Sequence, residues 1–377
     1  MISLCGRDCN NCVMKKEKMC NGCSMCDVSF CKCGEKRKRC MVVCPNKFGS
    51  FTLVKNTIVK EPLMGNKSLD LPIYIPIMPD KIKENFNFKA NKNIIAVHGE
   101  FFLNAAGSKI TGAYNPGFKA ALNLKEDLSG ILEFYIKDRT LEGFWDNRKA
   151  YNPGFKAALN LKEDLSGILE FYIKDRTLEG FWDNRKSIYK ELKHQDFLGI
   201  IAPNFSVYED APRLEHIYNI QRSKTIYNEM ISEGLPAIPD ISWYSKEDLN
   251  LWIKEINANN IKTIAFSFMN VDTRLKASNS WKHYLLGFKI LNFKIPKDVQ
   301  IIVAGISSIQ RVEEILKISK DRKISFMHQA AWVNSRNGVS VKDRKQLDRT
   351  ISKDTIFQNN LNFYIKEYER LMKEYSI

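Results

Sequence analysis

The sequence predicts an α/β protein in which a (β/α) TIM-like barrel follows a small Cys-rich metal-binding module and contains an inserted helical duplication. Three observations support this. All ten cysteines lie within residues 5–44, a 37-residue unit at 113–149 recurs unchanged at 150–186, and short apolar runs alternate with helical patterns after residue 70. The expected organisation is a Cys-rich module at 1–60, the first part of the barrel at 61–112, the duplication at 113–186, and the remainder of the barrel with a C-terminal helix at 187–377.

The cysteines form closely set triplets followed by a remote Cys-Pro. In order they are Cys5, Cys9, Cys12, Cys20, Cys23, Cys26, Cys31, Cys33, Cys40 and Cys44. Such triplets are typical of cubane iron–sulfur clusters, whereas zinc sites usually consist of separated C-x2-C pairs. The spacing predicts two metal centres, favours iron–sulfur slightly over zinc, and leaves two thiols spare. A purely structural role is the alternative, because so short a segment has too few large apolar side chains to fold unaided.

The first triplet permits a further interpretation. Its C-x3-C-x2-C spacing is also the one with which radical S-adenosylmethionine enzymes hold a cluster. In those enzymes an aromatic residue usually precedes the last cysteine, whereas Asn11 precedes Cys12 here, and no Gly-Gly-Glu segment follows a later strand. We therefore keep this enzyme class as a minor alternative.

The composition bears on compartment and partners. No run approaches the 18 apolar residues of a membrane helix, and the first residues lack the pattern of a secretory signal. We expect a cytoplasmic protein whose thiols stay reduced, with no membrane partner. The net charge of +15 favours nucleic acid or a nucleotide as partner. About half of this excess lies in residues 1–60, where metal-bound thiolates would offset part of it.

The elements follow in order along the chain. Residues 50–59 are predicted to form a small hairpin, and residues 60–70 have the composition of a linker. Strands are predicted at 71–77, 93–98, 198–203, 235–241, 262–268, 299–304 and 323–327. Their apolar positions are nearly continuous, as in strands covered on both faces. A helix is predicted at 246–257 with a capping box at Ser245 and Asp248, and another begins near Ser308. No Gly-rich phosphate loop follows a strand, which favours a barrel over a doubly wound sheet.

The duplication is an identical pair, unlike the divergent repeats of a solenoid. Each copy is predicted to form two helices, a short one from Pro116 and a second one with an apolar face. In the first copy that face comprises Leu128, Ile131, Leu132, Tyr135 and Ile136. A barrel has one place for such a unit. Because only the second copy runs directly into the strand at 198–203, we expect it to dock and the first copy to be looser or to pack outside.

Candidate site residues are the polar side chains after each strand, because ligands of parallel β/α folds lie at the carboxyl ends of the strands. The candidates for catalysis are Asp240, Asp210, Arg213, His98, Glu100 and His328. The candidates for ligand binding are Asn204, Ser206, Trp243, Asn270, Ser307, Arg311, Gln329 and Arg336. A carboxylate such as Asp240 suits a nucleophile or general base, and the arginines suit phosphate or carboxylate groups.

Several long segments resemble a known family. They are "LPIYIPIMPD", "LEFYIKDRTLEGFWDNRK", "IIAPNFSVYEDAPRLEHIYNIQRS", "AIPDISWYSKEDLNLWI", "IKTIAFSF" and "QAAWVNSRNG", behind a head that ends in "CMVVCP". Together they resemble an uncharacterised bacterial and phage family known only as a domain of unknown function. That family has one copy of the 37-residue unit and no assigned activity.

A second resemblance concerns the strand ends. The segments "PDISW" and "FMHQAAWVNSRNG" are loosely similar to queuine-type transglycosylases, barrel enzymes that exchange a nucleobase through an aspartate and carry a metal-binding cysteine site. This similarity implies a metal-dependent β/α-barrel enzyme that acts on a nucleobase or nucleic acid, with Asp240 as the reacting carboxylate and Trp243 as a stacking partner. The alternative is a non-catalytic nucleic-acid- or partner-binding protein of a phage or mobile element.

Overall fold

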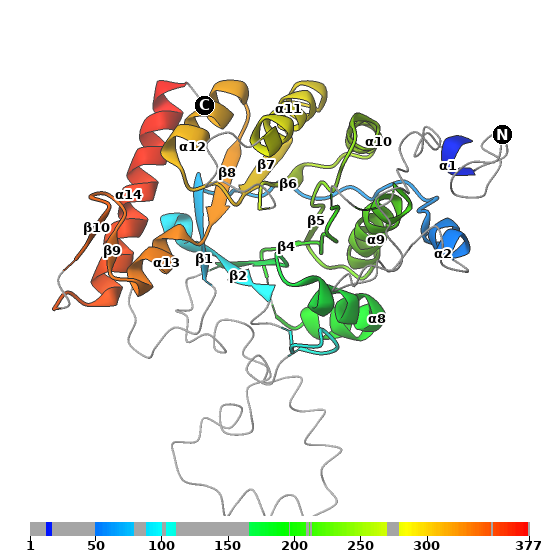
Figure 1. Cartoon of the computed structure of the whole chain (residues 1–377), viewed down its shortest axis with the longest axis horizontal. Coiled ribbons are helices and arrows are strands. Elements are labelled where there is room, and N and C mark those ends of the chain that lie inside the picture. Colours follow the sequence, from blue (N-terminus) through cyan, green and yellow to red (C-terminus); the bar gives the residue numbers. More distant parts are fainter. Residues whose placement is uncertain are drawn as a thin grey trace, which may run out of the picture.

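Eight parallel strands form a ring with helices around it in the computed structural model (Figure 1). The structure describes residues 13–16, 50–78, 88–99, 103–110, 166–195, 197–208, 211, 213–269, 279–347 and 350–375. The strands are β1 (Tyr74–Met78), β2 (Ile94–His98), β3 (Ser166–Glu170), β4 (Gly199–Ile201), β5 (Ala237–Ile238), β6 (Thr263–Ser267), β7 (Gln300–Ala304) and β8 (Ile324–His328). They are hydrogen-bonded in the order β5-β4-β3-β2-β1-β8-β7-β6.

The ring closes between the two ends of this order. Asp240, just after β5, forms a parallel bridge with Ala265 of β6. The Ile241 amide donates to the Ala265 carbonyl at 2.9 Å, and the Ala265 amide donates to the Pro239 carbonyl at the same distance. Every strand therefore has two neighbours, and the predicted (β/α) TIM-like barrel is confirmed.

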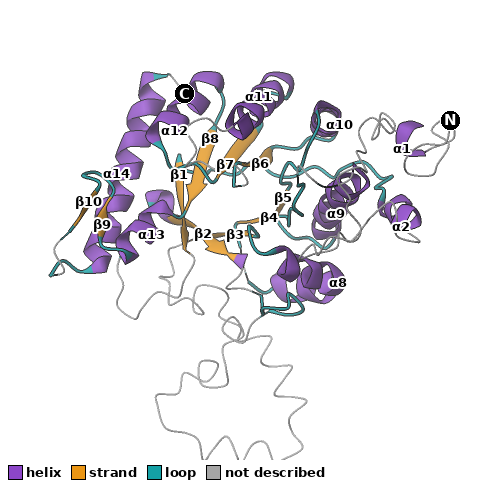
Figure 2. Cartoon of the chain, in the orientation of Figure 1, coloured by secondary structure: helices purple, strands orange, loops and turns teal. Residues whose placement is uncertain are grey.

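The helices of the outer layer follow the strands from β3 onward (Figure 2). They are α8 (Asp175–Leu192), α9 (Arg213–Ser232), α10 (Lys246–Ala258), α11 (Asn279–Lys294), α12 (Ile309–Ile318), α13 (Ala330–Arg336) and α14 (Lys353–Glu374). The short elements are α1 (Val13–Lys16), α2 (Ser50–Thr57), the 3-10 turn η3 (Asn91–Asn93), and the antiparallel pair β9 (Val339–Ser340) and β10 (Lys345–Gln346). Among the described residues, no helix has both the length and the apolar content to cross a membrane.

Two hydrophobic clusters reflect the alternation of side chains along each strand. The inner cluster has members on all eight strands and fills the barrel. It comprises Leu71, Ile75, Ile77, Ile94, Ala96, Ile168, Ile201, Ile238, Ala265, Ile302, Ala304 and Met327. The larger cluster combines the intervening strand residues with the helices and lies between sheet and helical layer. The nearly continuous apolar runs in the sequence are therefore explained by burial on both faces.

The segment before β1 differs from its prediction. Residues 50–57 form helix α2 and not one arm of a hairpin, because the Leu53, Val54 and Thr57 spacing suits a helix packed on α9. The predicted linker crosses the amino ends of β5 and β6. There the Asn66 side-chain amide donates to the Thr263 carbonyl at 2.7 Å and accepts from the Thr263 amide at 3.0 Å. The linker therefore supplies hydrogen-bond partners for backbone groups of Thr263, close to where an isolated bridge joins the β5 side of the ring to β6.

The duplicated segment also differs from its prediction. Residues 166–170 of the second copy form strand β3 where a helix was expected, and α8 begins in the same copy and continues past its end at 186. Ile168 and Leu169 are fully buried on opposite faces of the sheet, which only a strand allows. Docking of the second copy is thus confirmed for residues 166–186. The first copy, 113–149, lies outside the described residues.

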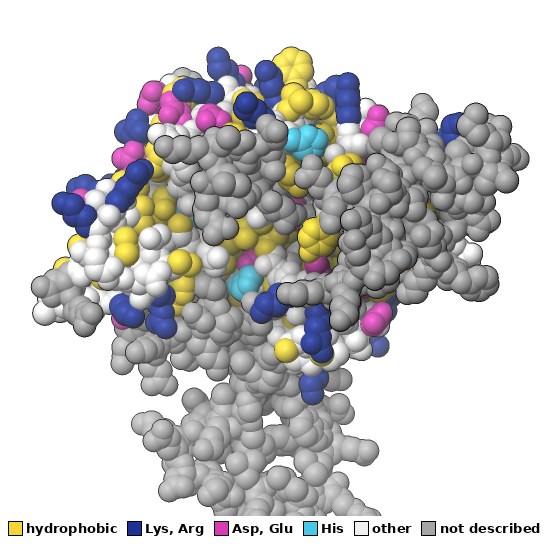
Figure 3. Space-filling model, in the orientation of Figure 1, with side chains coloured by type: hydrophobic (Ala, Val, Ile, Leu, Met, Phe, Trp, Pro, Cys, Tyr) yellow, Lys and Arg dark blue, Asp and Glu magenta, His cyan; other side chains and the backbone are white. Residues whose placement is uncertain are grey.

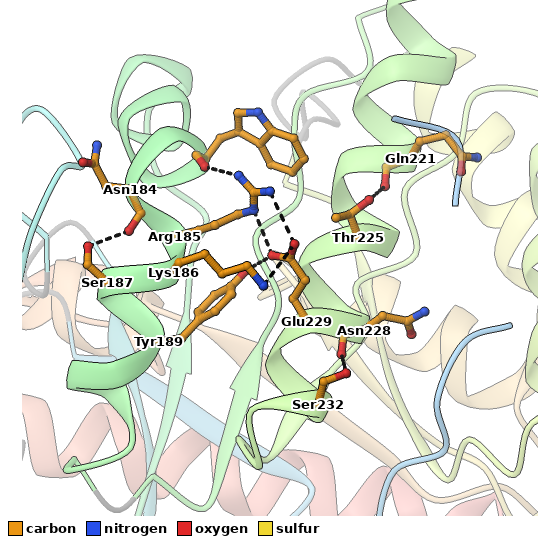
Figure 4. A network of polar contacts seen from close by, with 11 residues as sticks. Asn184, Arg185, Lys186, Ser187, Tyr189, Gln221, Thr225, Asn228, Glu229 and Ser232 are labelled. Atoms are coloured by element: carbon orange, nitrogen blue, oxygen red, sulfur yellow. Dashed lines mark hydrogen bonds and ion pairs between the residues drawn. The ribbon is translucent and has the colours of Figure 1, made fainter. Parts of the chain in front are cut away.

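Contacts to α9 and to the loop after β2 hold α8 in place (Figure 4). Arg185 donates to Glu229 of α9 at 2.8 Å, and the Tyr189 hydroxyl donates to the same carboxylate at 3.1 Å. Gly180 lies so close to Ala106 that an added Cβ would be 1.5 Å from its carbonyl oxygen. Only glycine permits this approach.

Candidate active site at the barrel mouth

Side chains alternate between the two faces of each strand, and this alternation, or parity, decides which polar side chains enter the barrel mouth. Residues two positions beyond an interior residue point to the same side of the sheet. At the carboxyl ends of β2, β3, β5 and β6, this rule places four polar side chains above the apolar interior, namely His98, Glu170, Asp240 and Ser267. The face drawn in Figure 3 is hollowed near its centre, where histidine and acidic side chains are visible.

His98 and Glu170 form a pair across neighbouring strands. They face each other in the β2–β3 register, and His98 Nδ1 contacts Glu170 Oε1 in a short hydrogen bond. The other carboxylate oxygen of Glu170 accepts a hydrogen bond of 2.6 Å from the Tyr172 amide. Glu170 is buried whereas His98 is 17% exposed, so the imidazole is the accessible member of the pair. A carboxylate in this position orients the imidazole ring through Nδ1.

Asp240 lies nearby in a buried position. Its Oδ2 accepts a hydrogen bond of 3.0 Å from the Asn204 side-chain amide, while its Oδ1 has no hydrogen-bond partner among the described residues. Burial raises the pKa of Asp240 to about 7; the Glu170 charge adds to this effect, and Asn204 and Tyr172 oppose it. Near neutral pH this carboxyl group therefore exists both as acid and as carboxylate, as a proton-transfer group requires.

Tyr172 connects the two carboxylates. Its backbone amide donates to Glu170, and its buried hydroxyl lies near Asp240 and Ser267 without forming a well-aligned hydrogen bond to a described residue. Burial holds the pKa of Tyr172 well above its usual range, and the charges of Asp240 and Glu170 raise it further. The hydroxyl therefore stays protonated and can donate to a carboxylate or a ligand. The mouth thus presents a titrating acid, an oriented imidazole, and a buried tyrosine hydroxyl next to the acid.

Other predicted site residues have different surroundings. Arg213 is buried at the start of α9 and forms two hydrogen bonds with Asp248 of α10, at 2.5 and 2.8 Å. Burial opposes ionisation of Asp248, but the hydrogen bonds and charge of Arg213 outweigh it and hold the pKa of Asp248 below its usual value. Asp248 also accepts from the Ser245 amide at 2.9 Å, which confirms the predicted cap of α10. Arg213 therefore joins helices α9 and α10, and the carboxylate that it pairs with is Asp248.

His328 points outward from β8. Its Nε2 is 2.9 Å from the Tyr368 hydroxyl of α14, and its ring lies 4.6 Å from that of Tyr74. Burial lowers the pKa of His328 to about 3, so the ring is neutral at physiological pH. The expected convergence on the mouth is wrong for this residue, because its parity along β8 places it in the helical layer.

Trp243 also points outward. Its indole ring stacks on His283 at 4.7 Å and leaves so little room that a Cβ on Gly287 would be 2.3 Å from it. Trp243 as a whole is 7% exposed, so its position does not support a stacking role on a ligand.

The remaining candidates are distributed over the structure or lie outside its described part. Ser206 donates to Asp175 at 2.7 Å. Arg311 lies over Trp281 at 4.4 Å, and Arg336 lies 5.7 Å from the Trp332 ring. Ser307 is half-buried beside Tyr364, and Gln329 is exposed before α13. Glu100, Asp210, Asn270 and the ten cysteines are outside the described residues.

The metal predictions concern that undescribed part. Within the residues that the structure describes, no three His, Cys, Asp or Glu side chains are grouped to hold a metal ion. The two centres expected at Cys5–Cys44, their metal, and the radical S-adenosylmethionine alternative all stay predictions.

Comparison with protein families adds one finding. Residues 154–314 match the family model of a domain of unknown function, DUF4417. The predicted resemblance to an uncharacterised domain family is therefore confirmed for this segment, which is less than half of the chain. The DUF4417 segment includes β3 to β7 with Glu170, Tyr172, Asn204 and Asp240, and of the two repeat copies it includes only the second. No curated protein matches the chain at a significant level.

Sequence reasoning missed three members of the site. Glu170, Tyr172 and Ser267 lie on or just after strands. Ser267 could have been found from the sequence, because it lies two residues beyond the interior residue Ala265 on a correctly predicted strand. Glu170 and Tyr172 were missed because "SGILEFY" was assigned to a helix. The alternation of Ile168, Glu170 and Tyr172 with Leu169 and Phe171 was the available signal.

Proposed function

We propose that the barrel mouth is the active site of an enzyme that transfers protons on a nucleobase or nucleotide substrate. The observation that carries this proposal is Asp240, a buried carboxyl with a pKa of about 7 whose Oδ1 forms no well-aligned hydrogen bond to a described residue, beside the His98–Glu170 pair. Such shifted titrating groups in a barrel mouth are typical of acid–base catalysis.

The chemistry proposed is cleavage or exchange of the bond between a base and its sugar. Asp240 in its acid form protonates a nitrogen of the leaving base, and the base–sugar bond breaks. His98, oriented by Glu170, accepts the proton of the incoming water or base as the new bond to the sugar carbon forms. The Asn204 amide, held on Asp240 at 3.0 Å, offers its carbonyl oxygen to the edge of a planar ring.

The test is base release or exchange with nucleosides and oligonucleotides, followed by chromatography with the full chain. We expect Asp240→Asn, which keeps the shape and the Asn204 contact, to reduce turnover at least 100-fold. Asp343→Asn changes an exposed carboxylate that contacts Ser340, and it should leave turnover unchanged. Equal turnover by Asp240→Asn and the wild type, or no turnover of any such substrate, would overturn the proposal.

A non-catalytic nucleic-acid-binding role is the second candidate. The observation that favours it is the net charge of +15, since clustered cations release counterions when they neutralise phosphates. Steeply salt-dependent DNA or RNA binding without base release would support this role. The metal centres expected in residues 1–60 are compatible with either function.

A further inference from the structure

A groove outside the barrel has no part in the proposed catalysis. It lies between the chain that leaves α2 and helices α9 and α10, with a volume of about 730 Å³. Sites for small molecules are commonly 300–1,000 Å³ in volume. α2 lies against α9 in Figure 1. The charged side chains that line the groove are Lys55, Lys60, Glu61, Lys224, Lys254 and Glu255.

Lys224 of α9 is the buried member of this set. Its side chain is 6% exposed and lines the groove, yet it forms no hydrogen bond or ion pair with any described residue. The ammonium group lies 4.8 Å above the Trp252 ring. Burial lowers the pKa of Lys224, and the charges of Glu255 and Asp248 oppose that effect. A buried cation without a hydrogen-bonded partner is costly, so an anion that enters the groove would relieve this cost.

The other cations of the groove are also uncommitted. Lys55, Lys60 and Lys254 are exposed and form no ion pair among the described residues. The Glu255 carboxylate, in contrast, accepts from the Leu63 amide at 3.2 Å and from the Asn259 side chain at 2.8 Å. One of the two acids of the groove is thus engaged in holding its wall, and the four lysines outnumber the two acids, Glu61 and Glu255, among the lining residues.

We propose that this groove binds the phosphate groups of a nucleotide-sized ligand, with Lys224 as the buried anchor. Lysine binds phosphate as a point charge, and several lysines around one groove can share a chain of phosphates. Free polyphosphates and the phosphates of a nucleic-acid strand have the same chemistry. The groove lies in the helical layer, so occupation of this site does not require Asp240 or the barrel mouth.

Calorimetric titration of the full chain with sodium tripolyphosphate and with a 12-nucleotide single-stranded DNA tests the proposal. We expect at least one probe to bind and Lys224→Met to weaken its binding at least tenfold. Methionine fills the same space without a charge, so this variant should fold with an unchanged or higher melting temperature. Lys289→Met removes an exposed charge from α11 and should change the affinity less than twofold.

The two probes distinguish the sources of phosphate. Loss of tripolyphosphate binding in Lys224→Met identifies a free phosphate ligand, and loss of DNA binding alone identifies a strand; both results support the groove. If neither probe binds the wild type, or if Lys224→Met and Lys289→Met bind equally well, the proposal is wrong. Turnover at the barrel mouth is measured separately with Asp240→Asn, so failure of one site is distinguishable from failure of the other.

Discussion

At the scale of single residues, Asp240 couples the proposed chemistry to stability. Burial raises its pKa from 3.8 to about 7, so between these values the folded chain binds a proton that the unfolded chain has lost. The stability contributed by this proton is complete below pH 3.8 and is lost as the pH rises towards 7. The difference between the two pKa values corresponds to about 4 kcal/mol at most. The ionised carboxylate therefore destabilises the fold.

Asp240→Asn should remove this dependence. The amide cannot ionise, and it keeps an oxygen for the Asn204 contact. We expect the variant to be more stable than the wild type by about 2–3 kcal/mol at pH 8, and the difference to be much smaller at pH 5. Denaturant unfolding at both pH values measures this. An equal difference at pH 5 and pH 8 would show that Asp240 does not titrate in this range.

The buried Arg213–Asp248 pair should behave differently, because its loss leaves one charge without a partner. Arg213→Met leaves the Asp248 carboxylate buried with only uncharged donors, namely the Tyr244 and Ser245 amides and the Ser245 hydroxyl. We expect a loss of about 3–5 kcal/mol in unfolding free energy. Lys262→Met, which breaks the more exposed pair with Asp298, is the matched control and should change stability little. Similar losses in both variants would contradict this assignment.

The sequence predicts the site only as far as it reveals which strand residues point into the barrel and which point outward. The rule of polar residues after strands found Asp240, Asn204 and His98, which the structure places at the mouth. It also selected His328 and Trp243, because a strand-end rule without parity cannot separate inward from outward side chains. Arg213 illustrates another limit. Its partner Asp248 is 35 residues away, and only the packing of α9 on α10 brings them together.

At the scale of elements, the two identical copies compete for one position in the barrel. The second copy is favoured by the residues that follow it, which are not part of its own 37 residues. Helix α8 continues beyond the repeat into Ser187–Leu192 and there buries Ile188, Tyr189 and Leu192. At about 1.5–3 kcal/mol for each large side chain, this extension favours the second copy by several kcal/mol. The first copy is followed by Ala150 and lacks these residues.

Matched substitutions in the two copies test this preference. Leu169 is fully buried in β3, and Leu132 has the same sequence context in the first copy. We expect Leu169→Asp to destabilise the barrel strongly, because it buries an unpaired charge, and Leu132→Asp to leave the melting temperature nearly unchanged. Equal effects of the two substitutions would show that both copies belong to the core.

Deletion of residues 113–149 tests the same point in another way. Because the copies are identical, this deletion and the deletion of 150–186 give one and the same 340-residue chain. We expect this chain to fold and to melt at a higher temperature than the full chain, since no second copy competes for the β3 position. A deletion variant that fails to fold would contradict the expectation.

The sequence predicted seven of the eight strands and missed β3 for a physical reason. In each copy the apolar residues recur at i, i+3, i+4 and i+7, as in Leu165, Ile168, Leu169 and Tyr172. That spacing also fits a strand with both faces buried, and the local pattern alone does not distinguish the two. Strand β5 shows a further limit. Only two of its residues pair regularly, and the barrel is closed there by the Asp240–Ala265 bridge.

At the scale of the whole molecule, the cysteines and the barrel strands lie in separate parts of the sequence. All ten cysteines precede residue 45, whereas the described barrel begins its strands at Tyr74 and contains no cysteine. We therefore expect the barrel to keep its packing without a metal, and the Cys-rich head, which has few apolar residues, to depend on one. Metal loss and barrel unfolding should consequently be separate events.

We expect the anaerobically purified chain to contain two metal centres bound by Cys5–Cys44. Absorption in the visible region with about eight irons per chain indicates two cubane clusters, whereas about two zinc ions without colour indicate zinc sites. A chelator or air should remove the metal and leave the main unfolding transition of the barrel at the same temperature.

Eight cysteines suffice for two centres, so two of the ten thiols should be spare. Serine substitutions of single cysteines should identify these two as the ones whose loss leaves the metal content unchanged. Protein with neither iron nor zinc above trace levels would end this interpretation, and joint loss of metal and barrel would show that the two regions fold as one.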